Sequence, residues 1–342
     1  MLYLGNKKVC PVKKVVETIS EPKFGLTPDS IIGDVNSSGI LQAPTEPCNL
    51  VFDGVTNIAA QALRYRFQYI TAIKSVSFPD LTSLTTTGAM QEAFRSCTGI
   101  TSISFPELKT ISGQSALTTA FYGNTGLTSV EFPELTTLSG SGCFSSAFRD
   151  CSNITSISFP KLTTINGGNA FQMAFYNNSK LKNIEFPSLT SITTLNACSN
   201  AFYGCGQLES ASFPELTIIG ANSSSNNNAH FSQAFMSSTL LTTLIFPKLQ
   251  KLYCTGGNSG SNGTFYNNNK VQKMYFPALD TITYGAGATS TNQSACKLIF
   301  TNCSSLTELH FGAANQAAIE ASPGYSTAWG RGAGNVTIYF DL

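Results

Sequence analysis

The chain has 342 residues, of which 42% are hydrophobic and 11% charged, and its formal net charge at pH 7 is +1. About a quarter of the residues of an ordinary soluble protein are charged, so Ser, Thr, Asn and Gly must supply much of the polar surface here. The sequence has no basic stripe of the kind that binds nucleic acid. It also lacks a run of about 18 apolar residues, so we expect no membrane span.

The N-terminal 48 residues do not fit the pattern that organises the rest of the chain. Residues 2–9 read as a strand broken by a Gly-Asn turn signal, and five prolines between positions 11 and 47 exclude a long helix. The segment is a possible attachment module, and its lysines at 7, 8, 13 and 14 are either an anionic contact or a solvated face. No apolar h-region follows these lysines, so we expect no secretory signal in this chain.

Residues 49–77 are predicted to be an N-terminal cap, because residues 57–67 have apolar residues at helical spacing. An end unit of a repeat array must shield the open end of the core, and a helix would do so.

From residue 78 to 311 one motif recurs, L-x-x-[IV]-x-F-P-x-L-[TKS]-x-[IL]. Its Phe residues are Phe78, Phe105, Phe132, Phe159, Phe186, Phe213, Phe246, Phe276 and Phe311. The first six are 27 residues apart, and a fixed period of this length is typical of a solenoid whose units bury their apolar sides against one another. The motif predicts a short strand with alternate residues inward, as for Ile100, Ile103 and Phe105, then a second very short strand after the proline.

A second apolar pair, Ala-Phe in most units, closes each unit. In most units an apolar residue four positions before this Phe, such as Leu117 before Phe121, completes the i, i+3, i+4 spacing of one helical turn. The copies of the pair are Ala93-Phe94, Ala120-Phe121, Ala147-Phe148, Ala174-Phe175, Ala201-Phe202, Ala234-Phe235, Thr264-Phe265 and Ile299-Phe300. Three residues after each Phe stands a small residue that we expect to form a buried ladder bonding to backbone groups. These residues are Cys97, Asn124, Cys151, Asn178, Cys205, Ser238, Asn268 and Cys303.

Extra residues enter the repeat at one point only, ahead of the second apolar pair. They fill residues 219–230, 254–263 and 284–294, which are rich in Asn, Ser, Gly and Thr. Such insertions lie on one face or edge of a solenoid. They are either recognition loops or tolerated decoration. Residues 312–342 leave the frame and predict a C-terminal cap with a helix over 313–321 and a strand over 336–340.

No constellation of catalytic, cofactor-binding or metal-binding residues is found. There is no C-x-x-C, no G-K-[ST] phosphate loop and no G-x-S-x-G, and the two histidines are 80 residues apart. The ten cysteines are better explained by buried packing, except that Cys10 and Cys48 flank the N-terminal segment and could pair there. Glu107, Glu134 and Glu215 recur after Phe-Pro and are interpreted as a solvated edge. We expect no enzyme and no cofactor.

Units such as residues 201–214, A-F-Y-G-C-G-Q-L-E-S-A-S-F-P, resemble the BspA-type leucine-rich repeats of bacterial surface proteins over about residues 70–311. The resemblance implies an α/β repeat fold that is mainly β. The expected architecture is a leucine-rich-repeat solenoid of about nine units, with short parallel strands on one face and single helical turns and loops on the other. The opening L-G-N-K-K-V and the closing N-V-T-I-Y-F resemble the ends of tail-associated and repeat proteins carried by phages and prophages of gut bacteria.

These resemblances imply a non-enzymatic binding or adhesion protein. In one hypothesis it is a phage or prophage tail component that recognises a polysaccharide or protein on the bacterial surface; in the other it is a secreted BspA-like adhesin that binds host or matrix proteins. A structural spacer without a ligand is a third. The location is then a phage particle or the bacterial cell surface, the partner a cell-surface protein or glycan, and an oligomer is possible.

The outward strand positions change character along the repeat. They are serines in the early units, such as Ser102 and Ser104, but toward the C-terminus they become larger and charged. The candidate binding residues are Ile245, Lys273, Tyr275, Glu308 and His310. We expect an exposed aromatic surface there, because rigid aromatics bury large area at little entropic cost and can stack on sugar rings. The alternative is that the sequence of the end units simply drifts, without a role in binding.

Overall fold

The computed structural model describes residues 3–4, 7–8, 47–194, 196–220, 230–253, 264–283, 299–330 and 335–342. Two of the predicted insertions, 254–263 and 284–294, lie outside these residues, as do most of 219–230 and the cysteine at position 10. Nothing below concerns them.

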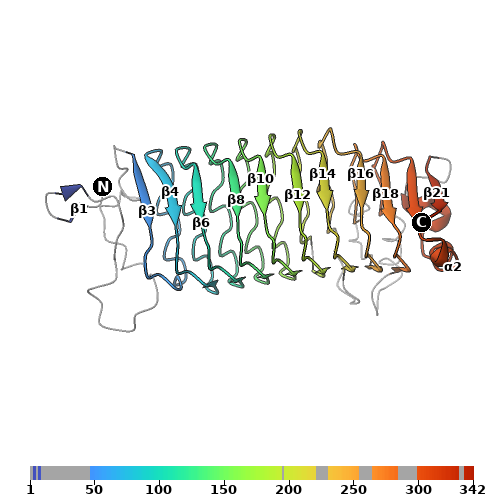
Figure 1. Cartoon of the computed structure of the whole chain (residues 1–342), viewed down its shortest axis with the longest axis horizontal. Helices are drawn as coiled ribbons and strands as arrows, with labels where there is room; N and C mark the ends of the chain where they lie inside the picture. The colour runs from blue at the N-terminus through green and yellow to red at the C-terminus, as the bar shows by residue number, and fades with distance from the viewer. Residues whose placement is uncertain are drawn as a thin grey trace.

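The chain coils into an elongated solenoid in which each coil adds one strand to each of two parallel sheets (Figure 1). The layer that we call the first sheet contains the strands of the L-x-x-[IV]-x-F motif, with β3 before them and β21 after them. Its strands are β3 (Cys48–Val51), β4 (Ile73–Ser77), β6 (Ser102–Ser104), β8 (Ser129–Glu131), β10 (Ser156–Ser158), β12 (Asn183–Glu185), β14 (Ser210–Ser212), β16 (Thr243–Ile245), β18 (Lys273–Phe276), β20 (Glu308–Phe311) and β21 (Thr337–Phe340). Its ladder is interrupted between β6 and β8, so β3, β4 and β6 pair as a three-stranded sheet and β8 to β21 as an eight-stranded one.

The second sheet is made of the short strands that follow Phe-Pro. They are β5 (Ser83–Leu84), β7 (Thr110–Ile111), β9 (Thr137–Leu138), β11 (Thr164–Ile165), β13 (Ser191–Ile192), β15 (Ile218–Ile219), β17 (Lys251–Tyr253) and β19 (Thr281–Thr283). Equivalent residues of successive coils pair in register, as Thr164 does with Thr137 and Ser191. The predicted mainly β, parallel-strand solenoid of about nine units is confirmed.

The single helical turns predicted on the remaining side are wrong. We call this third side the turn side; in one coil it runs over residues 113–126. The amides of Ser115, Leu117, Thr119 and Phe121 donate to carbonyls of the next coil at 2.7–2.9 Å. The amides between them close tight turns within their own coil, as Ala120 does on Leu117. Because every second amide crosses to the next coil, the segment forms a third ladder between coils and cannot also form a helix, whose amides bond along its own axis.

Left-handed residues every four positions generate this path. In the same coil Ser115, Thr119 and Gly123 have φ of 55°, 53° and 71°. Each repeats the same bend, so the residues four apart, Leu117 and Phe121, both point inward and are fully buried. The apolar spacing that suggests a helix therefore has a different cause. The sequence carries only part of this signal: Gly, Asn and Asp, which tolerate positive φ, fill positions such as Gly88, Asp150 and Asn177, whereas Tyr65 and Met173 adopt the same conformation.

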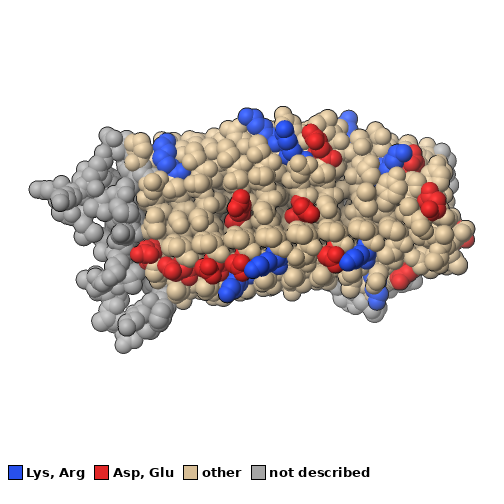
Figure 2. All heavy atoms as spheres, in the orientation of Figure 1, with Lys and Arg blue, Asp and Glu red and all other residues tan. Residues whose placement is uncertain are grey.

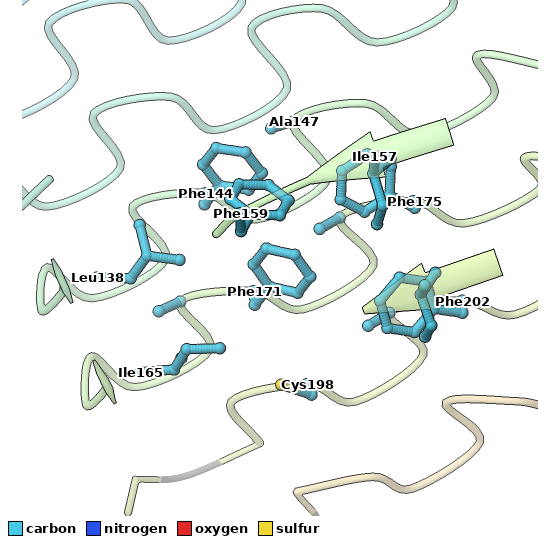
Figure 3. Close-up of a cluster of buried hydrophobic side chains, with 14 of the residues drawn as sticks. Leu138, Phe144, Ala147, Ile157, Phe159, Ile165, Phe171, Phe175, Cys198 and Phe202 are labelled. Atoms are coloured by element: carbon cyan, nitrogen blue, oxygen red, sulfur yellow. The ribbon is translucent and has the colours of Figure 1, made fainter. Parts of the chain in front are cut away.

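Phenylalanines stack along the core from coil to coil (Figure 3). Phe159 lies parallel to Phe132 and Phe186, with ring centroids 5.5 and 5.7 Å apart. Phe171 and Phe175 of the turn side meet it edge-on, at 5.7 and 6.2 Å. Offset-stacked and edge-to-face pairs are the favoured aromatic geometries, so identical residues at one repeat position give each coil the same packing.

The predicted buried polar ladder is confirmed at the end of each turn-side segment. Asn124 Nδ2 donates to the carbonyl of Phe94 at 2.9 Å, and Asn178 Nδ2 to that of Phe148 at 3.1 Å. Cysteine replaces asparagine in the alternate coils, with Cys151 Sγ 3.1 Å from the Phe121 carbonyl. The Phe94 and Phe121 carbonyls also accept long bonds from the amides of Cys97 and Asn124, at 3.4 and 3.3 Å. The ladder side chains therefore complete the hydrogen bonding of buried carbonyl groups.

The two ends of the array follow the coil pattern further than the sequence suggested. The helix predicted over residues 57–67 is wrong: β3 pairs with β4, Phe52 stacks on Phe78 at 4.2 Å, and 57–67 contain turns with positive φ at Gln61 and Tyr65. This segment is therefore a full coil of the solenoid. Its apolar residues have helical spacing because left-handed residues recur every four positions, as on the turn side of the other coils.

The C-terminal elements and the N-terminal hairpin agree with the sequence. The structure has η3 (Ala313–Asn315), α2 (Gln316–Glu320), η4 (Tyr325–Gly330) and strand β21. Near the N-terminus, β1 (Tyr3–Leu4) and β2 (Lys7–Lys8) pair antiparallel. The division into an attachment segment, caps and solenoid stays a prediction.

Candidate binding surface

Parallel pairing gathers the predicted binding residues into two rows at the C-terminal end of the first sheet. The charged row is Thr243, Lys273, Glu308 and Thr337, and the aromatic row is Ile245, Tyr275, His310 and Tyr339. Each row runs across β16, β18, β20 and β21, one residue per strand. The five predicted residues thus form one surface, and the structure adds Tyr339 to it.

The rings of the aromatic row stack face to face. Tyr275 and His310 lie 4.3 Å apart between centroids at 14°, and His310 and Tyr339 lie 4.6 Å apart at 11°. In-register parallel strands place equivalent side chains about 4.8 Å apart, the distance at which flat rings stack. The row therefore presents ring edges to the solvent rather than ring faces.

His310 is held on all sides. Its Nδ1 lies 3.0 Å from Asp341 Oδ1 and its Nε2 lies 3.1 Å from Glu308 Oε2. With a tyrosine on each face and a carboxylate at each nitrogen, only 7% of the residue is exposed. The expectation that a His310 face stacks on a sugar ring is therefore wrong for this structure, because both faces are covered.

The exposed parts of the surface are apolar and amphipathic. Ile245 is 49% exposed and Tyr339 38% exposed, and Tyr275 is half-buried between them. Beside them Lys273 Nζ forms an ion pair with Glu308 Oε2 at 2.9 Å. The hydrogen bond of this pair raises the pKa of Lys273. The pKa of Glu308 is lowered, first by the hydrogen bond from Lys273 and second by that from His310. The surface combines apolar area with a neutralised, oriented charge pair.

The same positions in earlier coils carry no aromatic ring and no large apolar side chain, although β8 and β12 have Glu131 and Glu185 in the row that holds Tyr275 later. In β6 and β10 they are serines, and Ser210 of β14 bonds to Asn183 of β12 at 2.7 Å. On the face shown in Figure 2, charges are sparse, and acidic side chains gather along the lower edge. The predicted solvated edge after Phe-Pro includes Glu134, paired with Lys161 of the next coil at 2.6 Å.

The leucine-rich character of these coils identifies the family. The model of the BspA type leucine rich repeat region matches the chain in three overlapping stretches, residues 56–173, 93–230 and 145–288, which together cover more than half of it. The chain belongs to the BspA-type leucine-rich repeat family. Leucine-rich repeat proteins are typically non-catalytic scaffolds that bind other proteins, and BspA-type repeats are typically surface-associated.

Two solved structures illustrate the distance to other repeat proteins. A leucine-rich repeat protein from Bacteroides ovatus shares 19% identity with the BspA-type chain, with a TM-score of 0.42 over 82% of this chain and 69% of that one. The TLR13–ssRNA13 complex shares 11%, with a TM-score of 0.21 over 88% of this chain and 54% of that one. No curated protein sequence is a significant match. At these values neither structure informs the binding surface.

Among the described residues of the BspA-type chain, no group of three His, Cys, Asp or Glu side chains could hold a metal ion, and no helix is long and apolar enough to span a membrane. Burial raises the pKa of the Cys97, Cys151 and Cys205 thiols to about 12. A thiol is nucleophilic only as the thiolate, so these cysteines have a structural role.

Sequence reasoning missed two features that concern binding. Tyr339 and Asp341 complete the aromatic row from β21, which lies outside the repeat motif and so could not be aligned with it. On the turn side, the residue after the second Phe is Arg95, Tyr122 and Arg149 in three consecutive coils. The repeat makes this second series visible, because those residues stand at one fixed position.

Proposed function

We propose that this BspA-type protein is a non-enzymatic binding protein that attaches to a component of a bacterial cell surface through the C-terminal end of its first sheet. The observation that carries the proposal is the aromatic row with its exposed Ile245 and Tyr339, set against serines at the same positions of earlier coils. Aromatic residues are enriched at the centres of protein interfaces.

The ligand that suits this surface best is a protein. The covered faces of His310 leave no platform for a sugar ring in the middle of the row, whereas ring edges, an aliphatic side chain and a charge pair suit a polypeptide surface. A glycan remains the second candidate, because the outer face of Tyr339 is not covered by another ring of the row.

Two settings fit a binding protein of this family. The proposal favours a phage or prophage tail component, supported by the resemblance of the two chain ends to such proteins. The alternative is a secreted adhesin that binds host or matrix proteins, supported by the surface-associated character of BspA-type repeats. The position of the gene would separate them, since tail genes as neighbours favour the first.

The test replaces the exposed row by the chemistry of the early coils. Ile245→Ser with Tyr275→Ser should weaken binding to intact bacterial cells about tenfold or more, since interface anchors each contribute at least about 1–2 kcal/mol. His310 is left unchanged because it is buried. The matched control, Ser104→Ala with Ser158→Ala, changes the same sheet row in coils of β6 and β10 and should bind as the wild type does.

Unfolding temperatures of both double variants establish that the fold is retained. Loss of binding in the serine control with unchanged binding of the Ile245/Tyr275 variant would place the site in the early coils and overturn the proposal. Purified cell-wall glycan, compared with cells treated with protease, distinguishes a glycan from a protein as the ligand.

A further inference from the structure

An arginine–tyrosine ladder runs along the turn side, on a different side of the solenoid from the aromatic row. It consists of the residues that follow the second Phe of successive coils: Arg95, Tyr122, Arg149, Tyr176 and Tyr203. The guanidinium of Arg95 lies 5.0 Å from the Tyr122 ring centre, and that of Arg149 lies 4.6 Å from Tyr176. Tyr176 and Tyr203 stack at 4.5 Å and 1°. Arg149 also lies 5.8 Å from the Tyr122 ring centre, so Tyr122, Arg149 and Tyr176 are each held between two neighbours in the adjacent coils.

The composition of this region differs from that of the rest of the chain. Only five residues of the 342 are arginine, and four of them, Arg64, Arg66, Arg95 and Arg149, lie in turn-side segments of the first four coils. Tyr69, at the end of the first of these segments, is 57% exposed. Tyrosine and arginine are the residue types most enriched at interface hot spots, and here they are concentrated in a chain whose surface is otherwise Ser and Thr.

The guanidinium groups keep donors for a partner. Arg95 Nη1 donates to Glu92 at 2.8 Å, and Arg149 Nη1 lies 3.7 Å from Met173 Sδ. Nε of both side chains is buried, and in Arg149 it is 3.5 Å from Asp150, so Nη2 of each arginine is the donor left for a partner. A guanidinium has five N–H donors, and the side chains of Arg95 and Arg149 are 38% and 35% exposed. Arg64, Arg95 and Arg149 outnumber Glu92 and Asp150, the two carboxylates beside Arg95 and Arg149, so these described side chains favour an anion.

The stacking also selects the kind of anion. Rings that stack on each other and on guanidinium groups expose their edges, so they offer no free face to a nucleic-acid base, which binds by stacking on aromatic rings. Arg95 and Arg149 are two coils apart, about 10 Å at the spacing of parallel strands. An extended segment in the polyproline II conformation rises about 3.1 Å per residue and completes one turn in three residues. Carboxylates three positions apart therefore lie on one face and would reach both arginines.

We propose that the arginine–tyrosine ladder is a second binding site, which takes an extended acidic segment of a partner protein. The segment lies along the solenoid axis, with carboxylates at positions i and i+3 on Arg95 and Arg149 and the residues between them on the edge of Tyr122. Because the ladder is held in place by its own stacking, little side-chain freedom is lost on binding. This site is independent of the surface that the proposed function uses.

The experiment measures binding of two synthetic peptides to the full chain by fluorescence anisotropy at low salt. One peptide carries glutamates at every third position, and the other has the same composition with its glutamates adjacent. We expect the first to bind about tenfold more tightly, and Arg95→Gln with Arg149→Gln to abolish that difference. The matched control removes two exposed lysines from other sides, Lys109→Gln with Lys182→Gln, and should leave the difference unchanged.

A further pair of variants separates binding from support of the fold. Asp150→Asn and Glu92→Gln release the arginines without shortening any side chain, and should strengthen binding of the first peptide several-fold. If the ladder serves only to hold the coils together, these variants alter the unfolding temperature and not the binding, and the proposal is wrong. Equal binding of both peptides, equal losses in the arginine and lysine variants, or binding of heparin without either peptide would also overturn it.

Discussion

The coils of β6 and β10 present serines on the outside of the first sheet, whereas those of β16, β18 and β20 present Ile245, Tyr275 and His310 at the same position. Inside, the two regions are alike: Phe105 stacks on Phe132 at 5.3 Å, and Phe246 on Phe276 at 5.5 Å. Every core position is constrained by its neighbours above and below, while an exposed outward position such as that of Ile245 is constrained far less by the coils beside it. A change confined to outward positions is therefore the place to look for binding.

The largest expected effect concerns the shared core. Phe159→Ala should lower the free energy of unfolding by about 3–5 kcal/mol, because it removes a fully buried ring stacked between Phe132 and Phe186. Denaturant unfolding followed by circular dichroism measures it. Phe340→Ala in the terminal strand, where the ring is only half-buried, should have a smaller effect. A loss below about 1 kcal/mol at Phe159 would contradict the stacked-core account.

A somewhat smaller effect is expected in the polar ladder. Asn178→Ala removes the donor to the Phe148 carbonyl and leaves that carbonyl buried, which should destabilise the protein by about 1–3 kcal/mol. Asn178→Cys restores a side chain that alternate coils already use and should recover part of the loss. If alanine and cysteine behave alike, the ladder bond contributes nothing.

The ladder thiols should be protected in the native state. Cys97, Cys151 and Cys205 are buried, and their pKa values of about 12 keep the thiols protonated at pH 8. A thiol reagent should therefore modify them only after denaturation. Mass spectrometry of labelled peptides locates the modified positions. Rapid native labelling at any of the three would place that residue on the surface, against the coil register.

The smallest expected effect is a pH dependence confined to the C-terminal rows. The pKa of Glu308 is lowered in the folded state by Lys273 and His310. A carboxylate whose pKa is lowered by folding stabilises the folded state at pH above its unfolded pKa of about 4.3. This stabilisation is lost as the pH falls through the folded pKa. The hydrogen-exchange protection factors of β21, which are corrected for the intrinsic pH dependence of exchange, should fall at acidic pH, and Glu308→Gln should reduce this fall. The coils of β6 and β10, whose strands carry serine there, should show none of it.

The sequence was sufficient for the period, the strands, the core phenylalanines and the buried polar ladder, because a residue that must fit every neighbouring coil recurs visibly. It misled where two backbone conformations give the same spacing of apolar residues. Leu117 and Phe121, four residues apart, would share one face of a helix, and they also share one face of the observed path with a left-handed residue every four positions. The five candidate binding residues lie on neighbouring strands of one surface, but the burial of His310 does not follow from their positions in the motif. It depends on Tyr339 and Asp341, which a strand outside the motif supplies.

The contrast between the two ends is tested most directly by side-chain footprinting of the protein with and without bacterial cell-envelope fragments. Hydroxyl-radical oxidation, read by mass spectrometry, reports the exposure of individual side chains. The account predicts that Ile245, Tyr275 and Tyr339 become protected in the presence of the fragments, while residues 98–107 and 152–161 in the coils of β6 and β10 react unchanged. Protection of those early coils, with Ile245, Tyr275 and Tyr339 as reactive as in the free protein, would contradict it.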